Sequence, residues 1–79
     1  MKDNLVVLGG GESGIGAAYL AKKNGIKVFL SDKNLIHNKY KKILSDNKIE
    51  FEEGNHSLNK LLSATEVVKS PGISDDSNL

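Results

Sequence analysis

The sequence predicts an α/β fold: a parallel sheet of about four strands, in the order 3-2-1-4, with flanking helices. Residues 5–8 form an unalternated apolar run, which is typical of a strand covered on both faces. Segments of strand composition alternate with segments of helical periodicity, and strands separated by helices run parallel through right-handed crossovers. A glycine-rich turn joins the first strand to the first helix. Together these observations predict a Rossmann-like sheet.

The first two helices and the strand between them follow from periodicity and from their stop signals. A first helix is expected over residues 14–24, with lysines in its last turn and Gly25 as its stop. Residues 26–30 are rich in Ile, Val and Phe and predict the second strand. Apolar residues then recur at helical spacing over 35–46, which predicts a second, amphipathic helix.

The second half of the chain carries two shorter strands. Residues 48–53 alternate between apolar and charged side chains, as in a half-buried strand at the edge of a sheet. Ser57 is expected to cap a brief helix that carries leucines, and residues 66–69 predict the fourth strand. A sheet of this size would leave the fourth strand exposed at one edge. We therefore expect a sheet truncated at its last strand, in a fragment of a larger multidomain protein.

Length, charge and composition restrict the classes of function. Seventy-nine residues make one small domain, residues 1–79, and a formal net charge of +1 lacks the basic excess of a nucleic-acid binder. The chain has no cysteine, and its short apolar runs predict neither a signal peptide nor a membrane span. We expect a cytoplasmic location, with no nucleic-acid and no membrane partner. All eleven basic residues are lysines, so a bound phosphate would depend on backbone N–H groups, hydroxyls and lysine charges.

Three loops are expected to meet beyond the carboxyl ends of the strands, where ligands bind in open α/β sheets. They are residues 9–14, 31–33 and 70–73. In the third loop, proline fixes one backbone dihedral and glycine lets the backbone approach a ligand closely. Taken alone such a turn is typical of a simple connection, so the convergence of the three loops carries the argument.

The first loop has Gly9, Gly11 and Gly14 at the spacing G-x-G-x-x-G. Such a turn lets a diphosphate approach the backbone, and N–H groups around Ser13 and Gly14 would bind it with the helix dipole behind them. The Ser13 hydroxyl adds a donor, whereas the carboxylate of Glu12 would repel a diphosphate unless it points away. The alternative interpretation is a turn that only packs the helix against the strand.

Asp32 follows the second predicted strand, eighteen positions after Gly14. In dinucleotide-binding folds an acid about 20 residues beyond the glycines accepts hydrogen bonds from ribose hydroxyls. The same carboxylate could accept a ring N–H from a pyrimidine base, or it could cap the following helix. Spacing alone leaves all three roles open.

The sequence predicts no catalytic and no metal-binding residues. His37 and His56 have no second ligand at metal spacing and are interpreted as solvated surface residues. Glu50, Glu52 and Glu53 are interpreted as a solvated face of the edge strand. The chain contains no G-x-x-x-x-G-K-[ST] loop for ATP and no pairing of a nucleophile with a base. We therefore expect no cofactor in this segment.

Three stretches of the sequence resemble the N-terminal domain of the Mur ligase family. They are GGGESGIGAAYLAKKNG, then VFLSDK, and then the fourth predicted strand leading into SPGI. The resemblance extends over residues 5–73, and the SPGI turn is its most specific element. Within the family the sequence is most similar to the ligase that adds D-glutamate to UDP-N-acetylmuramoyl-L-alanine.

The resemblance implies that this domain binds the UDP moiety of a UDP-linked muramoyl substrate. One group of residues would contact the uridine and the diphosphate, partly through the backbone; a second would face the uracil; a third would close over the nucleotide. In that order the groups are Gly11, Glu12, Ser13 and Gly14; Asp32 and Lys33; and Ser70, Pro71, Gly72 and Ile73.

The resemblance also implies a longer parent enzyme. Its central domain would bind ATP and Mg²⁺, its C-terminal domain would bring the amino acid, and the reaction would belong to peptidoglycan synthesis. Those groups are not in this sequence, so we expect the isolated 79 residues to be inactive.

Two other classes of protein share the glycine loop and the acid. One is the NAD-binding half of an oxidoreductase, because Gly9, Gly11, Gly14 and Asp32 satisfy its fingerprint equally well. The other is a nucleotide-sensing regulatory domain, which is not an enzyme. The SPGI turn favours the ligase over both.

Overall fold

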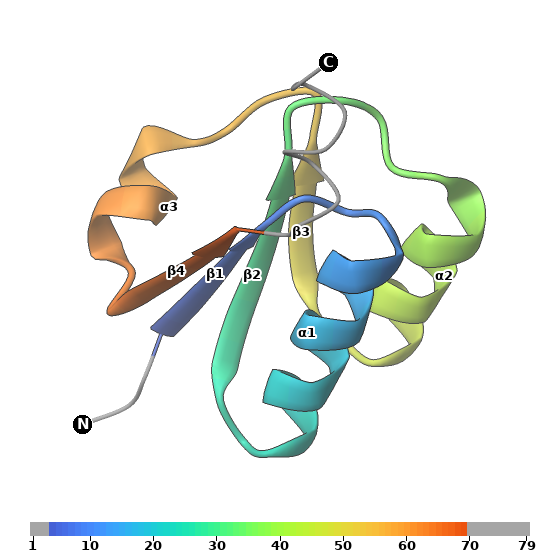
Figure 1. Cartoon of the computed structure of the whole chain (residues 1–79), viewed down its shortest axis with the longest axis horizontal. Coiled ribbons are helices and arrows are strands. Elements are labelled where there is room, and N and C mark those ends of the chain that lie inside the picture. Colours follow the sequence, from blue (N-terminus) through green and yellow to red (C-terminus); the bar gives the residue numbers. More distant parts are fainter. Residues whose placement is uncertain (1–3, 70–79) are drawn as a thin grey trace.

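The computed structural model describes residues 4–69, which form a four-stranded sheet with three helices (Figure 1). Strands and helices alternate along the chain, as the sequence predicts. In chain order the elements are β1 (Asn4–Leu8), α1 (Glu12–Lys23), β2 (Lys27–Asp32), α2 (Asn38–Asp46), β3 (Glu50–Glu53), α3 (Leu58–Ser63) and β4 (Glu66–Lys69).

The strands of the sheet are parallel and lie in the order β3-β2-β1-β4, which confirms the predicted arrangement. The chain moves from β1 through β2 to β3 and then returns to the other side of β1 to form β4. Helices α1 and α2 cover one face of the sheet, and α3 lies on the opposite face (Figure 1). The strand order changes direction at β1, and ligands of open α/β sheets bind at such a point.

The return to β1 joins segments that are far apart in the sequence. The backbone N–H of Thr65 donates to the carbonyl oxygen of Asn4 at 2.8 Å, and the N–H of Asn4 donates to the Thr65 hydroxyl at 2.8 Å. Strand β4 then pairs with β1 up to Lys69, which lies opposite Leu8. As a result β1 has a strand partner on each side.

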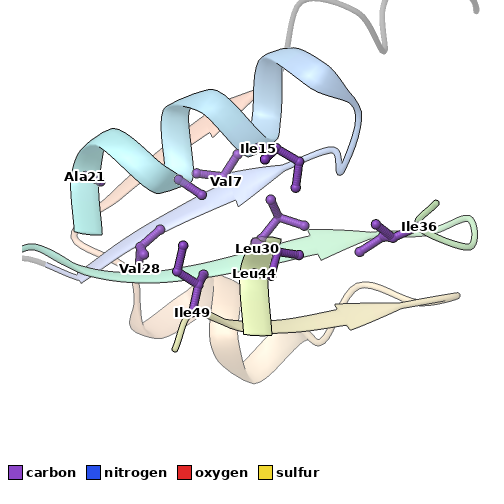
Figure 2. Close-up of a cluster of buried hydrophobic side chains, with 9 residues drawn as sticks. Val7, Ile15, Ala21, Val28, Leu30, Ile36, Leu44 and Ile49 are labelled. Carbon is purple, nitrogen blue, oxygen red and sulfur yellow. The ribbon is translucent and has the colours of Figure 1, made fainter. Parts of the chain in front are cut away.

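The main core lies between the sheet and helices α1 and α2 (Figure 2). Its most deeply buried members are Val7, Ala18, Leu30 and Leu44, which have no exposed surface. The other members of this cluster are Ile15, Ala21, Val28, Ile36 and Ile49. Val6 is also buried, and because side chains alternate along a strand it faces the side of α3. Strand β1 is therefore covered on both faces, as its unbroken apolar run predicts.

Helices α1 and α2 end in the same hydrogen-bonded motif. After α1, the N–H of Ile26 donates to the carbonyl of Ala21 around Gly25, which has a φ of 80°. After α2, the N–H of Ile49 donates to the carbonyl of Leu44 around Lys48, which has a φ of 58°. This six-to-one bond defines a Schellman ending, which requires a left-handed residue and prefers glycine there. Gly25 is the stop that the sequence predicts, whereas Lys48 takes the same conformation with a side chain.

Several boundaries differ from the predicted ones. Helix α2 starts at Asn38 rather than at residue 35, because Ile36 reaches the core from a loop and not from a helical turn. Strand β3 starts at Glu50 rather than at residue 48, since Lys48 belongs to the helix ending. Helix α1 starts two residues earlier than predicted, at Glu12, and β2 extends to Asp32.

Replacing Leu44, the buried leucine of α2, should destabilise the folded state strongly. We expect Leu44→Ala to lower the free energy of unfolding by about 2–5 kcal/mol, because it leaves a cavity under the helix. A core this small rarely supplies more than about 3–5 kcal/mol in total. Urea denaturation measures the change, with Ile43→Ala on the same helix, at a residue 37% exposed, as the control. Equal effects of the two substitutions would contradict this account of the core.

The two helix endings provide a matched pair of substitutions. We expect Lys48→Gly to raise the free energy of unfolding by about 0.5–1 kcal/mol, because glycine adopts the left-handed conformation without steric cost. Gly25→Lys should lower it by about 1–2 kcal/mol for the converse reason. Chemical denaturation measures both changes. A loss of stability in Lys48→Gly would show that the lysine side chain makes a compensating contact.

Candidate functional site

The candidate site lies at the carboxyl ends of β1 and β2, where two of the three predicted loops come together. Residues 9–11 connect β1 to α1, and residues 33–37 connect β2 to α2. The two loops are adjacent because β1 and β2 are neighbours whose last paired residues are Leu8 and Ser31. The predicted third loop, with Ser70, Pro71, Gly72 and Ile73, lies outside the described residues.

The glycines at 9, 11 and 14 differ in what the structure requires of them. Gly9 has a φ of 112°, and its N–H donates to the carbonyl of Ser31 at 2.8 Å, which fixes the turn at the end of β1. A Cβ at Gly14 would lie 1.8 Å from the carbonyl oxygen of Gly9, so only glycine lets the helix approach the strand so closely. A Cβ at Gly11 would have no heavy atom of the described residues within 4 Å. Packing therefore explains Gly14 but leaves Gly11 unexplained.

The first turn of α1 presents backbone donors at this loop. Gly11 is the N-cap residue and has no side-chain capping bond. Within residues 4–69, the N–H groups of Glu12, Ser13 and Gly14 donate to no protein acceptor. Gly11, Glu12 and Ser13 are exposed, and a helix of 12 residues stands behind them. Free N–H groups at the positive end of a helix dipole form a binding site for an anion.

Asp32 connects the two loops. Its Oδ2 accepts the N–H of Gly10 at 2.8 Å, and its Oδ1 accepts the N–H of Asn34 at 2.9 Å. Asp32 does not cap the following helix, because the N-cap of α2 is His37, whose Nδ1 accepts the N–H of Lys39 at 3.5 Å. The capping alternative is therefore wrong. The carboxylate is half-buried, and within residues 4–69 each oxygen accepts one of these bonds, which leaves it a lone pair for a ligand donor.

Lys33 is the exposed residue that follows Asp32 in the second loop. It stands one position beyond the carboxyl end of β2. The structure thus brings two of the three predicted loops together beside the N-terminus of α1, with Asp32 and Lys33 in the second of them.

Glu52 and His56 are not the solvated residues that the sequence suggests. The buried hydroxyl Oγ of Ser31 lies 2.8 Å from Glu52 Oε2 and 2.6 Å from His56 Nδ1. Glu52 Oε2 also accepts the N–H of Ser57 at 2.6 Å. A hydroxyl has one hydrogen and a carboxylate only accepts, so these bonds are all satisfied when His56 Nδ1–H donates to Ser31 and Ser31 donates to Glu52. The alternation of residues 48–53 could not reveal this network, because Ser31 lies on another strand.

The ionised state of Glu52 follows from these contacts. Partial burial would raise the pKa of its carboxyl group. The hydrogen bonds from Ser57 and Ser31, with the electrostatic effect of His56, outweigh burial and lower that pKa overall. The carboxylate therefore holds the loop after β3 against the end of β2.

Glu53 likewise binds the second loop rather than facing solvent. Its Oε1 accepts the N–H of Ile36 at 2.8 Å, and its Oε2 accepts Lys41 Nζ at 3.1 Å. The bond from Ile36 and the ammonium group of Lys41 lower the pKa of Glu53. Of the three glutamates on β3, Glu50 alone keeps an exposed position, 3.9 Å from Lys60 Nζ.

A groove between α1 and α2 adjoins the site, and sequence reasoning did not identify it. It has a volume of about 520 Å³ and is mostly apolar. Its lining residues come from the two helices and are Glu12, Ile15, Gly16, Tyr19, Lys39, Tyr40 and Ile43. Glu12 belongs both to this lining and to the first turn of α1.

The described part of the chain contains neither a candidate metal cluster nor a candidate membrane-spanning helix. Within residues 4–69, no cluster of three or more histidine and carboxylate side chains could hold a metal ion. None of the helices in that same range has the length and apolarity needed to cross a bilayer.

Comparisons with known proteins agree on one family. Residues 4–79 match the family model described as the MurD N-terminal domain. Over 75 residues the chain is 56% identical to the UDP-N-acetylmuramoylalanine–D-glutamate ligase of Christiangramia forsetii and 55% identical to that of Bacteroides fragilis. Over 73 residues it is 48% identical to the ligase of the same name from Cytophaga hutchinsonii.

These alignments cover 95%, 95% and 92% of this chain but 17%, 17% and 16% of the three relatives. The chain therefore spans less than a fifth of their length. The family match includes the sheet, the glycine loop and Asp32. The resemblance to Mur ligases is thus confirmed, and the chain belongs to the MurD N-terminal domain family.

Proposed function

We propose that this chain binds the UDP moiety of UDP-N-acetylmuramoyl-L-alanine, as the N-terminal domain of an ATP-dependent ligase that adds D-glutamate in peptidoglycan synthesis. The names of the relatives support the substrate and the reaction, since each is a UDP-N-acetylmuramoylalanine–D-glutamate ligase. Such a ligase would act in the cytoplasm, where we expect this protein.

One observation carries the proposal: an open helix N-terminus stands directly beside a carboxylate. The N–H groups of Glu12, Ser13 and Gly14, which donate to no acceptor among the described residues, suit the diphosphate, because backbone donors and the helix dipole favour negative charge. Asp32, bonded to Gly10 in the same loop, suits ribose hydroxyls or the uracil N–H. Lys33 adds a positive charge on the uracil side.

The open space at Gly11 supports the same placement. Its φ of −85° and ψ of −170° are accessible to any residue, and no atom of residues 4–69 would meet a Cβ there. The packing of residues 4–69 therefore leaves this space open to a ligand. A diphosphate lying on the first turn of α1 would be such a ligand.

Two further parts of the chain are proposed to contact the ligand: Glu12 and the third loop. Glu12 would contact the ligand through its backbone N–H, because its carboxylate would repel phosphate. Glu12 also lines the groove between α1 and α2, which lies along the side of α1.

Residues Ser70, Pro71, Gly72 and Ile73 would close over the nucleotide. In support, the register of Lys69 opposite Leu8 means that the chain leaves β4 next to the start of the glycine loop.

We propose that ATP and Mg²⁺ bind to other domains of the parent enzyme. The sequence has no G-x-x-x-x-G-K-[ST] loop, and the described residues contain no cluster of carboxylates that suits Mg²⁺. This chain would supply substrate binding and orientation, while the central and C-terminal domains would supply the chemistry. The isolated 79 residues would then have no ligase activity.

A titration distinguishes this proposal from a dinucleotide-binding domain. We expect UDP and UDP-N-acetylmuramoyl-L-alanine to bind more tightly than NADH, because the site has donors for one diphosphate and a carboxylate for one nucleoside. Isothermal titration gives the affinities. Amide resonances should move most at Gly11, Ser13, Gly14, Asp32 and Lys33. Tighter binding of NADH would overturn the proposal in favour of an oxidoreductase fragment.

Two glycines of the same segment provide a test of the binding surface. We expect Gly11→Ala to weaken binding of UDP about tenfold, because its methyl group would enter the space of the diphosphate without meeting protein atoms. Gly16→Ala, which also meets no protein atom, is the control and should bind UDP normally. Thermal denaturation should show both variants folded. Normal binding by Gly11→Ala would place the diphosphate elsewhere.

A further inference from the structure

The loop that carries Lys33 is anchored from the third strand of the sheet. Residues 33–37 join β2 to α2, and Glu53 is the last residue of β3. The carboxylate of Glu53 accepts the N–H of Ile36 at 2.8 Å through Oε1 and the ammonium group of Lys41 at 3.1 Å through Oε2. One side chain therefore connects β3 to this loop and to α2.

Ile36 extends that connection to the glycine loop. Its side chain is 4% exposed, and a Cβ at Gly10 would lie 2.8 Å from its Cγ1, so Ile36 packs directly against the backbone of Gly10. The N–H of Gly10 in turn donates to Asp32 Oδ2 at 2.8 Å. A displacement of Ile36 would therefore disturb both Gly10 and Asp32.

Other contacts of the loop show why Glu53 is important to it. Asn34 donates its N–H to Asp32 at the start of the loop, and its carbonyl accepts the N–H of Gly54 at 3.1 Å. In the described part of the chain, Glu53 holds the backbone at Ile36, in the second half of the loop. Each of these hydrogen bonds restrains its own part of the loop, since a residue left free keeps its conformational entropy.

We propose that Glu53 is a positioning residue for the nucleotide site: through the N–H of Ile36 it holds the Lys33 loop against the glycine loop. The proposal rests on the proposed function, because it assigns to Glu53 the geometry of the same UDP site. Glu53 itself does not contact the ligand. Its effect passes through Ile36 to Gly10 and Asp32.

Two conservative substitutions of Glu53 distinguish the effect of side-chain length from the effect of side-chain charge. Glu53→Gln keeps the length of the side chain and an oxygen that accepts the Ile36 N–H, but loses the charge that attracts Lys41. Glu53→Asp keeps the charge but is one methylene shorter, so it loses the bond to Ile36. Glu50 provides the control on the same strand, because it is exposed and pairs with Lys60 rather than with the loop.

The test is isothermal titration of the 79-residue chain with UDP-N-acetylmuramoyl-L-alanine. We expect Glu53→Asp to weaken binding roughly three- to tenfold, the loss that corresponds to one hydrogen bond. Glu53→Gln should stay within about twofold of the unaltered chain, as should Glu50→Asp and Glu50→Gln. In amide spectra without ligand, the resonances of Ile36 and Gly10 should shift in Glu53→Asp and not in Glu50→Asp.

The outcomes separate this inference from the proposed function. No binding of the UDP ligand by the unaltered chain would overturn the proposed function and this role with it. Normal binding by Glu53→Asp, when the unaltered chain binds, would overturn the positioning role alone. Equal weakening in Glu53→Asp and Glu53→Gln would also overturn it, because the contact with Lys41, which both substitutions weaken, rather than the bond to Ile36 would then be responsible.

Discussion

The close approach of α1 to β1 is the constraint on which the rest of the structure depends. A single methyl group at Gly14 would lie 1.8 Å from the carbonyl oxygen of Gly9, so a side chain there would force the helix away from the strand. The approach sets Ile15 and Ala18 into the core above Val7. It also brings the first turn of α1 to the carboxyl end of β1. The packing of α1 and the proposed binding of the diphosphate thus depend on the same glycine.

Much of the fold could be predicted because its signals are local. The apolar run of β1, the glycine turn and the alternation of helices with strands fix a parallel sheet, and its order follows from general rules of connection. Helix boundaries were less accurate. Ile36 has the spacing of a helical residue, but it reaches the core from a loop whose backbone is bonded to Glu53, seventeen positions away.

In the candidate site, too, the residues with local sequence signals could be predicted and those with long-range contacts could not. Gly11, Gly14 and Asp32 could be identified from spacing, since the first loop and the second strand lie close together in sequence. The roles of Glu52, Glu53 and His56 could not. These side chains bind groups on other elements, which the local pattern of polar and apolar residues does not reveal. From that pattern alone they are interpreted as solvated.

The pairing of β1 with β4 has a consequence for the order in which the chain folds. Asn4 and Thr65 are 61 positions apart, so the second side of β1 is completed only after nearly all of the described chain has left the ribosome. Until then the nascent polypeptide exposes an unpaired strand of apolar residues, the kind of edge on which misassembly begins. Contacts of such long range also slow folding.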